Sequence, residues 1–229
     1  MQRKTEKSLK AYELWTWARC RDKILSLKNR LGYGDNLWIL GFELHDDGCF
    51  FDPIRDELMF NPAKAPKPNL IPFHCSAVPE MYLLLSKYAE ASEVTLTEKS
   101  VSPGNLDCLM RFKLDEKECS HLLQYAEINF ADLKFRSPFL DSVLDLGDFS
   151  FSVLPLPKVP VTLVLWHGDN ELGNAGTLFF DASIAECLPG MALELAGLTV
   201  WRLRNILDPR VKWGYHMLTS CDNNERVRK

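Results

Sequence analysis

Two apolar segments constrain the fold of this chain more than any other feature of its sequence. They read VPVTLVLW at residues 159–166 and GTLFFDAS at residues 176–183, and the polar loop HGDNELGNA joins them. Each segment is short, continuous and rich in β-branched or aromatic residues, which is typical of a strand buried on both faces. We therefore predict that the two segments are neighbouring strands of a covered sheet.

Further strands are predicted on both sides of these two segments. Residues 148–157, DFSFSVLPLP, alternate apolar and polar side chains as a half-buried strand does. Residues 36–44 and 48–60 are expected to form a hairpin, because the Asp-Gly pair in HDDG between them favours a tight turn. Residues 93–99, EVTLTEK, are expected to add one more strand.

The order of the predicted elements favours an α+β fold, with a mixed, largely antiparallel sheet and helices packed on it. A length of 229 residues suits one large domain, so we predict a single domain over residues 1–229. The proline-rich segment 61–72 is expected to be an extended loop inside that domain. Apolar residues at helical spacing predict helices over residues 5–31, 78–91, 115–130 and 191–207.

Charge is distributed unevenly along the chain. Residues 1–30 hold nine Lys and Arg against three Asp and Glu, and residues 200–229 hold seven against three. The formal net charge of the whole chain is nevertheless −4, so the part between these ends is strongly acidic. An acidic body repels nucleic acid, so we do not expect a nucleic-acid partner. The basic ends could bind an acidic protein or mediate oligomerisation, or they could simply be the solvated faces of terminal helices.

We expect a cytoplasmic protein without a membrane-spanning segment. No apolar run approaches the ~20 residues that cross a bilayer, and the first fifteen residues, MQRKTEKSLKAYELW, lack the apolar core of a signal peptide. The seven cysteines are odd in number and show no C-x-x-C spacing, which favours reduced thiols over a disulfide framework.

The loop between the two apolar segments supplies candidate functional residues. Asp169, Glu171 and Asp181 are expected to converge at one end of the sheet, next to Trp166. Three carboxylates could hold a divalent metal ion through oxygen ligands or act as an acid/base pair, and together with Trp166 they could bind a ligand. Alternatively, the same carboxylates accept hydrogen bonds from backbone N–H groups, which is ordinary turn chemistry.

A second candidate site lies next to the proline-rich segment. His74 and Cys75 are adjacent, so both could reach a soft metal, or His74 could bind the metal of a haem or corrinoid axially. The alternative is a buried thiol beside a hydrogen-bonded imidazole. Nucleophilic catalysis has little support, because no G-x-S-x-G motif occurs and Cys187 lies in an acidic region that would not lower its pKa. No glycine-rich phosphate-binding motif occurs either.

Residues 149–204 carry a pattern that resembles a known family. A P-L-P-x-x-P step (Pro155, Pro157 and Pro160) leads into W-x-G-D-x-E at residues 166–171, then into F-D-x-S at residues 180–183 and a Leu-Pro pair. This pattern is similar to that of an uncharacterised prokaryotic domain of unknown function, found mainly in anaerobic bacteria and methanogenic archaea. The resemblance implies a link to tetrapyrrole or corrinoid metabolism, with haem or a corrinoid as the corresponding cofactor.

The sequence therefore leads to an expectation of an accessory protein that binds a small ligand or a protein partner, and it argues against an enzyme. Trp166, Asp169, Glu171, Asp181 and His74 are the candidate ligand-binding residues. One alternative is a metal-dependent enzyme that uses the three carboxylates. Another is a protein-interaction module that uses basic terminal helices.

Overall fold

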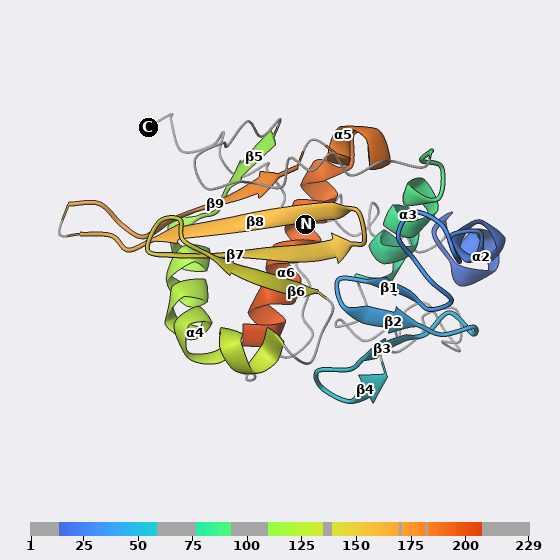
Figure 1. The fold of residues 1–229 in the computed structure, drawn as a ribbon, viewed down its shortest axis with the longest axis horizontal. Helices are drawn as coiled ribbons and strands as arrows, with labels where there is room; N and C mark the ends of the chain where they lie inside the picture. The colour runs from blue at the N-terminus through green and yellow to red at the C-terminus, as the bar shows by residue number, and fades with distance from the viewer. Residues whose placement is uncertain are drawn as a thin grey trace, which may run out of the picture.

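The computed structural model describes residues 14–58, 77–92, 110–134, 139–169, 171–181 and 183–207 (Figure 1). Element labels follow Figure 1. The described helices are α2 (Trp17–Leu25), α3 (Val78–Tyr88), α4 (Glu116–Lys134), α5 (Ser183–Cys187) and α6 (Ala192–Leu207).

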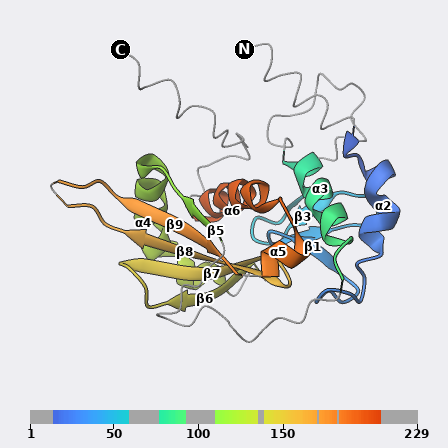
Figure 2. The same ribbon diagram turned by 90° about the horizontal axis from the view of Figure 1, so that it is seen from above.

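The larger sheet has five strands in the order β5-β9-β8-β7-β6, and every neighbouring pair is antiparallel. Helices α4 and α6 contact each other and cover one face of this sheet (Figures 1 and 2). Side chains on both faces of the central strand β8 are buried, including Leu163 on one face and Thr162 and Val164 on the other. The prediction that this strand is covered on both sides is thus confirmed. The five strands are β5 (Met110–Lys113), β6 (Leu140–Leu144), β7 (Phe149–Leu156), β8 (Val159–Trp166) and β9 (Ala175–Phe180).

The smaller sheet is an antiparallel meander of four short strands, where the sequence predicted one hairpin of two long strands. The predicted strand 36–44 is itself a hairpin, because Leu40 and Gly41 adopt φ angles of 55° and 76° and reverse the chain between β1 and β2. Two consecutive residues with positive φ make the kind of turn that matches the twist of paired strands. The hairpin across HDDG is present between β2 and β3. The strands are β1 (Leu37–Ile39), β2 (Phe42–Leu44), β3 (Phe50–Asp52) and β4 (Glu57–Leu58).

The α+β class is therefore confirmed, with two antiparallel sheets in place of one mixed sheet. The predicted helices 78–91, 115–130 and 191–207 correspond to α3, α4 and α6 within a few residues. The predicted helix 5–31 is present only as the shorter helix α2, because the helix is interrupted before Trp17 and ends at Leu25, where turns follow; residues 5–13 lie outside the described residues. The predicted strand 93–99 and loop 61–72 lie outside the described residues, and the single domain over residues 1–229 stays a prediction. No helix in the described ranges has the length and apolar character needed to cross a membrane.

Helix α6 connects the two sheets through a buried ion pair. The Arg202 guanidinium donates two hydrogen bonds of 2.8 Å to the Asp52 carboxylate and one of 3.0 Å to the Leu40 carbonyl. It also lies over the Phe42 ring, 3.9 Å from the ring centroid. Both Arg202 and Asp52 have no solvent exposure, so an unpaired charge here would be costly. The pair therefore fixes the meander against α6 in one orientation.

Replacing one partner of this pair is expected to destabilise the protein strongly. Asp52→Asn leaves the buried guanidinium without a counter-charge, and we expect the free energy of unfolding to fall by about 3–5 kcal/mol. Urea unfolding followed by circular dichroism measures the change. Asp56→Asn is the matched control, because Asp56 is exposed in the turn that follows β3 and should change stability by less than about 0.5 kcal/mol. Equal effects of the two substitutions would contradict the assignment.

Candidate functional site

The three carboxylates singled out in the sequence do not form one site. Asp169 and Glu171 lie in the loop between β8 and β9, next to the Trp166–Ala175 pair. Asp181 follows β9 at the opposite end of the sheet, beside the Val161–Phe180 pair. Five residue steps along an antiparallel ladder separate the two places by roughly 17 Å. The expected convergence is therefore wrong, and within the described ranges no group of three or more His, Cys, Asp or Glu could hold a metal ion.

Of the two loop carboxylates, that of Asp169 acts in turn formation. Asp169 Oδ1 accepts the N–H groups of Glu171 and Leu172 at 2.8 Å each, and these hydrogen bonds hold the pKa of Asp169 below its ordinary value. The Gly168 N–H donates to Asn174 Oδ1 at 2.7 Å, and Asn174 Nδ2 donates to Ser120 Oγ at 2.8 Å on α4. The loop is thus closed on itself and attached to the first turns of α4.

Asp181 has a different environment from the loop. It is buried at the start of α5, where its carbonyl accepts the Ile184 N–H at 3.1 Å. Cys187 ends the same short helix, and burial, followed by the charge of Glu186, raises the pKa of its thiol to about 11. This thiol is protonated at neutral pH and is therefore a poor nucleophile. His74, the remaining predicted ligand, lies outside the described residues.

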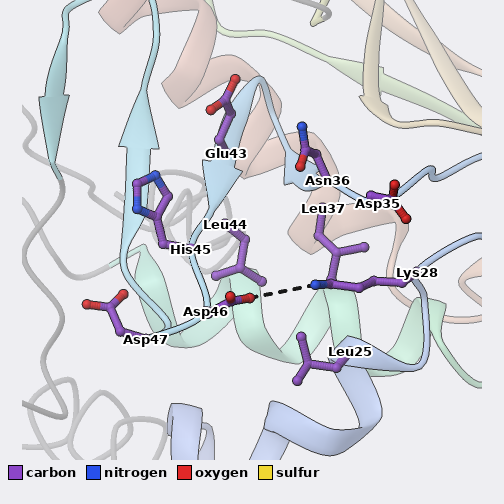
Figure 3. A pocket seen from close by; sticks show the side chains of 10 residues that line it. All are labelled: Leu25, Lys28, Asp35, Asn36, Leu37, Glu43, Leu44, His45, Asp46 and Asp47. Atoms are coloured by element: carbon purple, nitrogen blue, oxygen red, sulfur yellow. Dashed lines mark ion pairs between the residues drawn. The ribbon is translucent and has the colours of Figure 1, made fainter.

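A cavity of about 590 Å³ lies between α2 and the β1–β2 hairpin (Figure 3). Its size falls within the range of roughly 300–1,000 Å³ that is usual for small-molecule sites. Leucine side chains supply apolar surface, and most other side chains carry oxygen acceptors. The lining residues are Leu25, Lys28, Asp35, Asn36, Leu37, Glu43, Leu44, His45, Asp46 and Asp47.

The cavity has an excess of negative charge. Four carboxylates and one lysine line it, and Lys28 Nζ lies 3.6 Å from Asp46 Oδ1. Asp35 Oδ1 accepts a hydrogen bond of 3.2 Å from Asn29, and Asp47 Oδ1 accepts the Cys49 N–H at 2.9 Å. The exposed carboxylate of Glu43 makes no ion pair with any described residue, so it is available to a ligand.

Contacts outside the cavity hold its walls in place. The Lys23 ammonium of α2 is ion-paired with Glu90 after α3, and an Arg30 guanidinium nitrogen donates to the Ala91 carbonyl at 3.2 Å. The Tyr33 hydroxyl donates to the Trp38 carbonyl of β1 at 2.7 Å. Both walls are thus attached to well-packed elements, which reduces the ordering that a ligand would have to impose.

These cavity residues were not predicted from the sequence. Residues 45–48 were expected to form a turn and residues 36–44 one continuous strand, so no concave surface was expected there. The available signal was the alternation in Phe42, Glu43, Leu44 and His45, which places polar side chains on the outward face of a strand. Alternation of apolar and polar residues alone does not distinguish the wall of a cavity from an ordinary solvent-exposed face of a strand.

One buried carboxyl group belongs neither to the β8–β9 loop nor to the cavity. Glu80 lies in the first turn of α3, and its Oε2 is buried without a hydrogen-bond partner among the described residues. Burial raises the pKa of Glu80 to about 7. A carboxyl group that titrates near neutral pH is a candidate for proton transfer or for a pH response.

The fold and the cavity define a class of α+β protein built from two antiparallel sheets with an acidic chamber at one end. The chain belongs to the family described as Domain of unknown function (DUF3786), whose model matches residues 73–199. No curated protein matches the chain. No solved structure matches it either. The family match covers the larger sheet, α4, α5 and the first half of α6, whereas the cavity residues precede it.

The two glycines of the β8–β9 loop are expected to differ in their tolerance of alanine. A Cβ at Gly168 would overlap the backbone of residues 172–174, whereas a Cβ at Gly173 would meet the end of the Glu116 side chain, which can move away. Gly168→Ala should therefore lower the melting temperature and increase amide exchange in the loop, and Gly173→Ala should change both much less. Equal effects would mean that the backbone is less closely packed than described.

Glu80 is expected to make stability depend on pH. Because its pKa is higher in the folded state than its usual value of 4.5, the folded protein binds the proton more tightly. This contribution is complete below about pH 4.5 and is lost as the pH rises through about 7. Glu80→Gln should therefore be more stable than the wild type at pH 8, by on the order of 1–3 kcal/mol, and the gain should disappear at pH 4.5.

Urea unfolding at the two pH values measures this difference. Glu186→Gln, on an exposed position of α5, is the matched control and should show no such pH-dependent gain. If the stability difference for Glu80→Gln were the same at both pH values, Glu80 would not be a titrating group of the folded state.

Proposed function

We propose that this protein binds a small, positively charged ligand in the cavity between α2 and the β1–β2 hairpin. The observation that carries the proposal is the lining itself, which holds four carboxylates and a single lysine around about 590 Å³ of space. Such a lining attracts a cation and repels an anion. The proposal makes the protein a binding protein and not an enzyme.

The lining also indicates the shape of the ligand. Leu25, Leu37 and Leu44 line the cavity together with the carboxylates. In Figure 3 the Leu25 and Leu44 side chains lie below the Glu43 carboxylate. An aliphatic chain could pack on the leucines while an amino group at its end meets Glu43. An aliphatic amine combines both features, and burial of its chain contributes roughly 0.8 kcal/mol per CH₂ group.

The chemistry of the cysteines supports a binding role inside a reducing compartment. Burial, followed by the charge of Asp115, raises the pKa of Cys119 to about 11, as burial does for Cys187. Neither thiol is therefore activated as a nucleophile. Cys20, Cys119 and Cys187 are buried and free of disulfides, which agrees with a cytoplasmic location.

The link to tetrapyrrole or corrinoid metabolism remains part of the proposal as the context in which such a binding protein would act. It comes from the resemblance of residues 149–204, and the cavity is formed by an earlier part of the chain. Haem carries carboxylates that the cavity lining would repel, so haem is expected to bind elsewhere or not at all.

The proposal predicts selective binding of an amine. Hexylamine should raise the melting temperature and give saturable binding in calorimetry, whereas hexanoate, its anionic counterpart, should do neither. Glu43→Gln should weaken hexylamine binding at least about threefold, because it removes the unpaired charge without changing the size of the side chain. Glu186→Gln on the distant helix α5 should leave the affinity unchanged.

Two outcomes would contradict the cavity as the ligand site. Equal binding of hexylamine and hexanoate would mean that the charge of the lining is not used, and unchanged hexylamine affinity in Glu43→Gln would place the site elsewhere. Haem and hydroxocobalamin are tested in parallel by their absorption spectra. Tight binding of either by the Glu43→Gln variant would assign the function to another surface.

A further inference from the structure

We propose that the cationic group of the ligand is a quaternary ammonium group, held on the Glu43 carboxylate between the rings of Trp38 and Phe51. This inference rests on the proposed function, because Glu43 also lines the cavity, and it names the class of cation that the site takes. The evidence for it comes from the register of the four-stranded meander.

The strand register places Glu43 between two aromatic residues. Trp38 of β1 is the partner of Glu43 of β2, and Glu43 is in turn the partner of Phe51 of β3. Partners in an antiparallel ladder lie on the same face of a sheet, so these three side chains form one row. Leu58 of β4 is the partner of Phe51 and continues the row.

This row lies on the outer face of the meander. Glu43 is exposed, Leu58 is 65% exposed, and Trp38 and Phe51 are half-buried. Figure 3 shows the Glu43 and His45 side chains pointing up from β2, whereas the neighbouring leucine points down. The opposite face provides the apolar side chains that pack in the core, and these are Leu37, Ile39, Phe42, Leu44 and Phe50. The aromatic rings of the row therefore lie on a face that is open to a ligand.

The spacing of the strands lets one cation contact both rings. Neighbouring strands lie about 4.8 Å apart, so the backbones of β1 and β3 are separated by roughly 10 Å, with β2 midway between them. A cation–π contact requires the cation to lie within about 6 Å of the ring centroid. A cation held on the Glu43 carboxylate is therefore within reach of both Trp38 and Phe51.

Both rings are held in place by other aromatic side chains. The Tyr33 ring meets the Trp38 ring edge to face, with 5.9 Å between the ring centroids. The His45 ring lies 6.0 Å from the Phe51 ring, centroid to centroid. Because these contacts exist without a ligand, binding costs less conformational entropy than it would if the rings had to be ordered first.

The surroundings of Glu43 favour a quaternary ammonium group over a primary one. A primary ammonium group is strongly hydrated and has three hydrogen bonds to donate, and the side chains of Trp38, Phe51 and Leu58 contain no acceptor for them. A quaternary ammonium group donates no hydrogen bonds, so it loses none when it leaves water. Its methyl groups pack on aromatic rings, whose negative faces attract its charge. The carboxylate of Glu43, which makes no ion pair with any described residue, supplies the counter-charge.

Calorimetric titration of the full-length protein with two cations tests this inference. Hexyltrimethylammonium and hexylamine carry the same chain and the same charge, and the first should bind at least about threefold more tightly. Trp38→Leu and Phe51→Leu should each weaken hexyltrimethylammonium binding at least about threefold and change hexylamine binding by less than about twofold. Glu43→Gln should weaken the binding of both cations. Phe149→Leu is the matched control, because Phe149 is a half-buried aromatic residue on β7 of the larger sheet, and it should leave both affinities unchanged.

Two further measurements guard against a variant that simply fails to fold. The melting temperature of each variant is measured without ligand, and Trp38→Phe, which keeps a ring at this position, should retain most of the affinity. The N-methyl protons of hexyltrimethylammonium should shift upfield in NMR spectra on binding, because an aromatic ring shields protons that lie over its face. This shift should be smaller with Phe51→Leu, even at saturation.

The same titrations separate failure of this inference from failure of the proposed function. Equal affinities for the two cations, or a preference for hexyltrimethylammonium that persists in both leucine variants, would overturn the inference. If hexylamine binding still depended on Glu43 in that case, the proposed function would stand without it. If neither cation bound in a way that depends on Glu43, both proposals would fail.

Discussion

The ion pair between Arg202 and Asp52 is the interaction on which the arrangement of the molecule depends. Through it α6, which packs on the larger sheet, is bonded to the meander, and the Phe42 ring stacked on Trp201 adds to this contact. A buried arginine is stable only with a counter-charge and hydrogen-bond acceptors, and here each of its three nitrogens donates one hydrogen bond, to the Asp52 carboxylate or the Leu40 carbonyl, while Phe42 covers its face. The Leu40 N–H donates in turn to the Pro155 carbonyl of β7 at 2.8 Å. The turn at Leu40 is thus connected to both α6 and the larger sheet.

The elements that were predicted correctly are those with a strong local signal. The strands around VPVTLVLW and the helix over residues 191–207 have long apolar patterns, and the structure contains both. The short edge strands β5 and β6 read MRFK and LDSVL, which carry no distinctive pattern and form because longer strands beside them offer hydrogen-bonding partners. The reversal at Leu40 was missed because leucine seldom adopts a positive φ. Its conformation is imposed by the tertiary contacts of its backbone.

The predicted acidic site failed for a topological reason. A hairpin brings together the end of one strand and the start of the next, so only residues near the connecting loop become neighbours. Asp169 and Glu171 satisfy this condition, whereas Asp181 comes after the return strand and lies at its far end. The cavity could not be found by the same kind of reasoning. Its carboxylates come from several short segments whose approach depends on the Leu40 turn and on the contacts between α2 and α3.

The boundary of the family match has a consequence for how relatives should be compared. The matched region begins at residue 73, after the last residue that lines the cavity, so membership implies the larger sheet and not the chamber. A homologue could thus share the larger sheet but have a different N-terminal segment, which would bind another ligand or none. Ligands found for one member should be transferred to another only where the preceding seventy or so residues align as well.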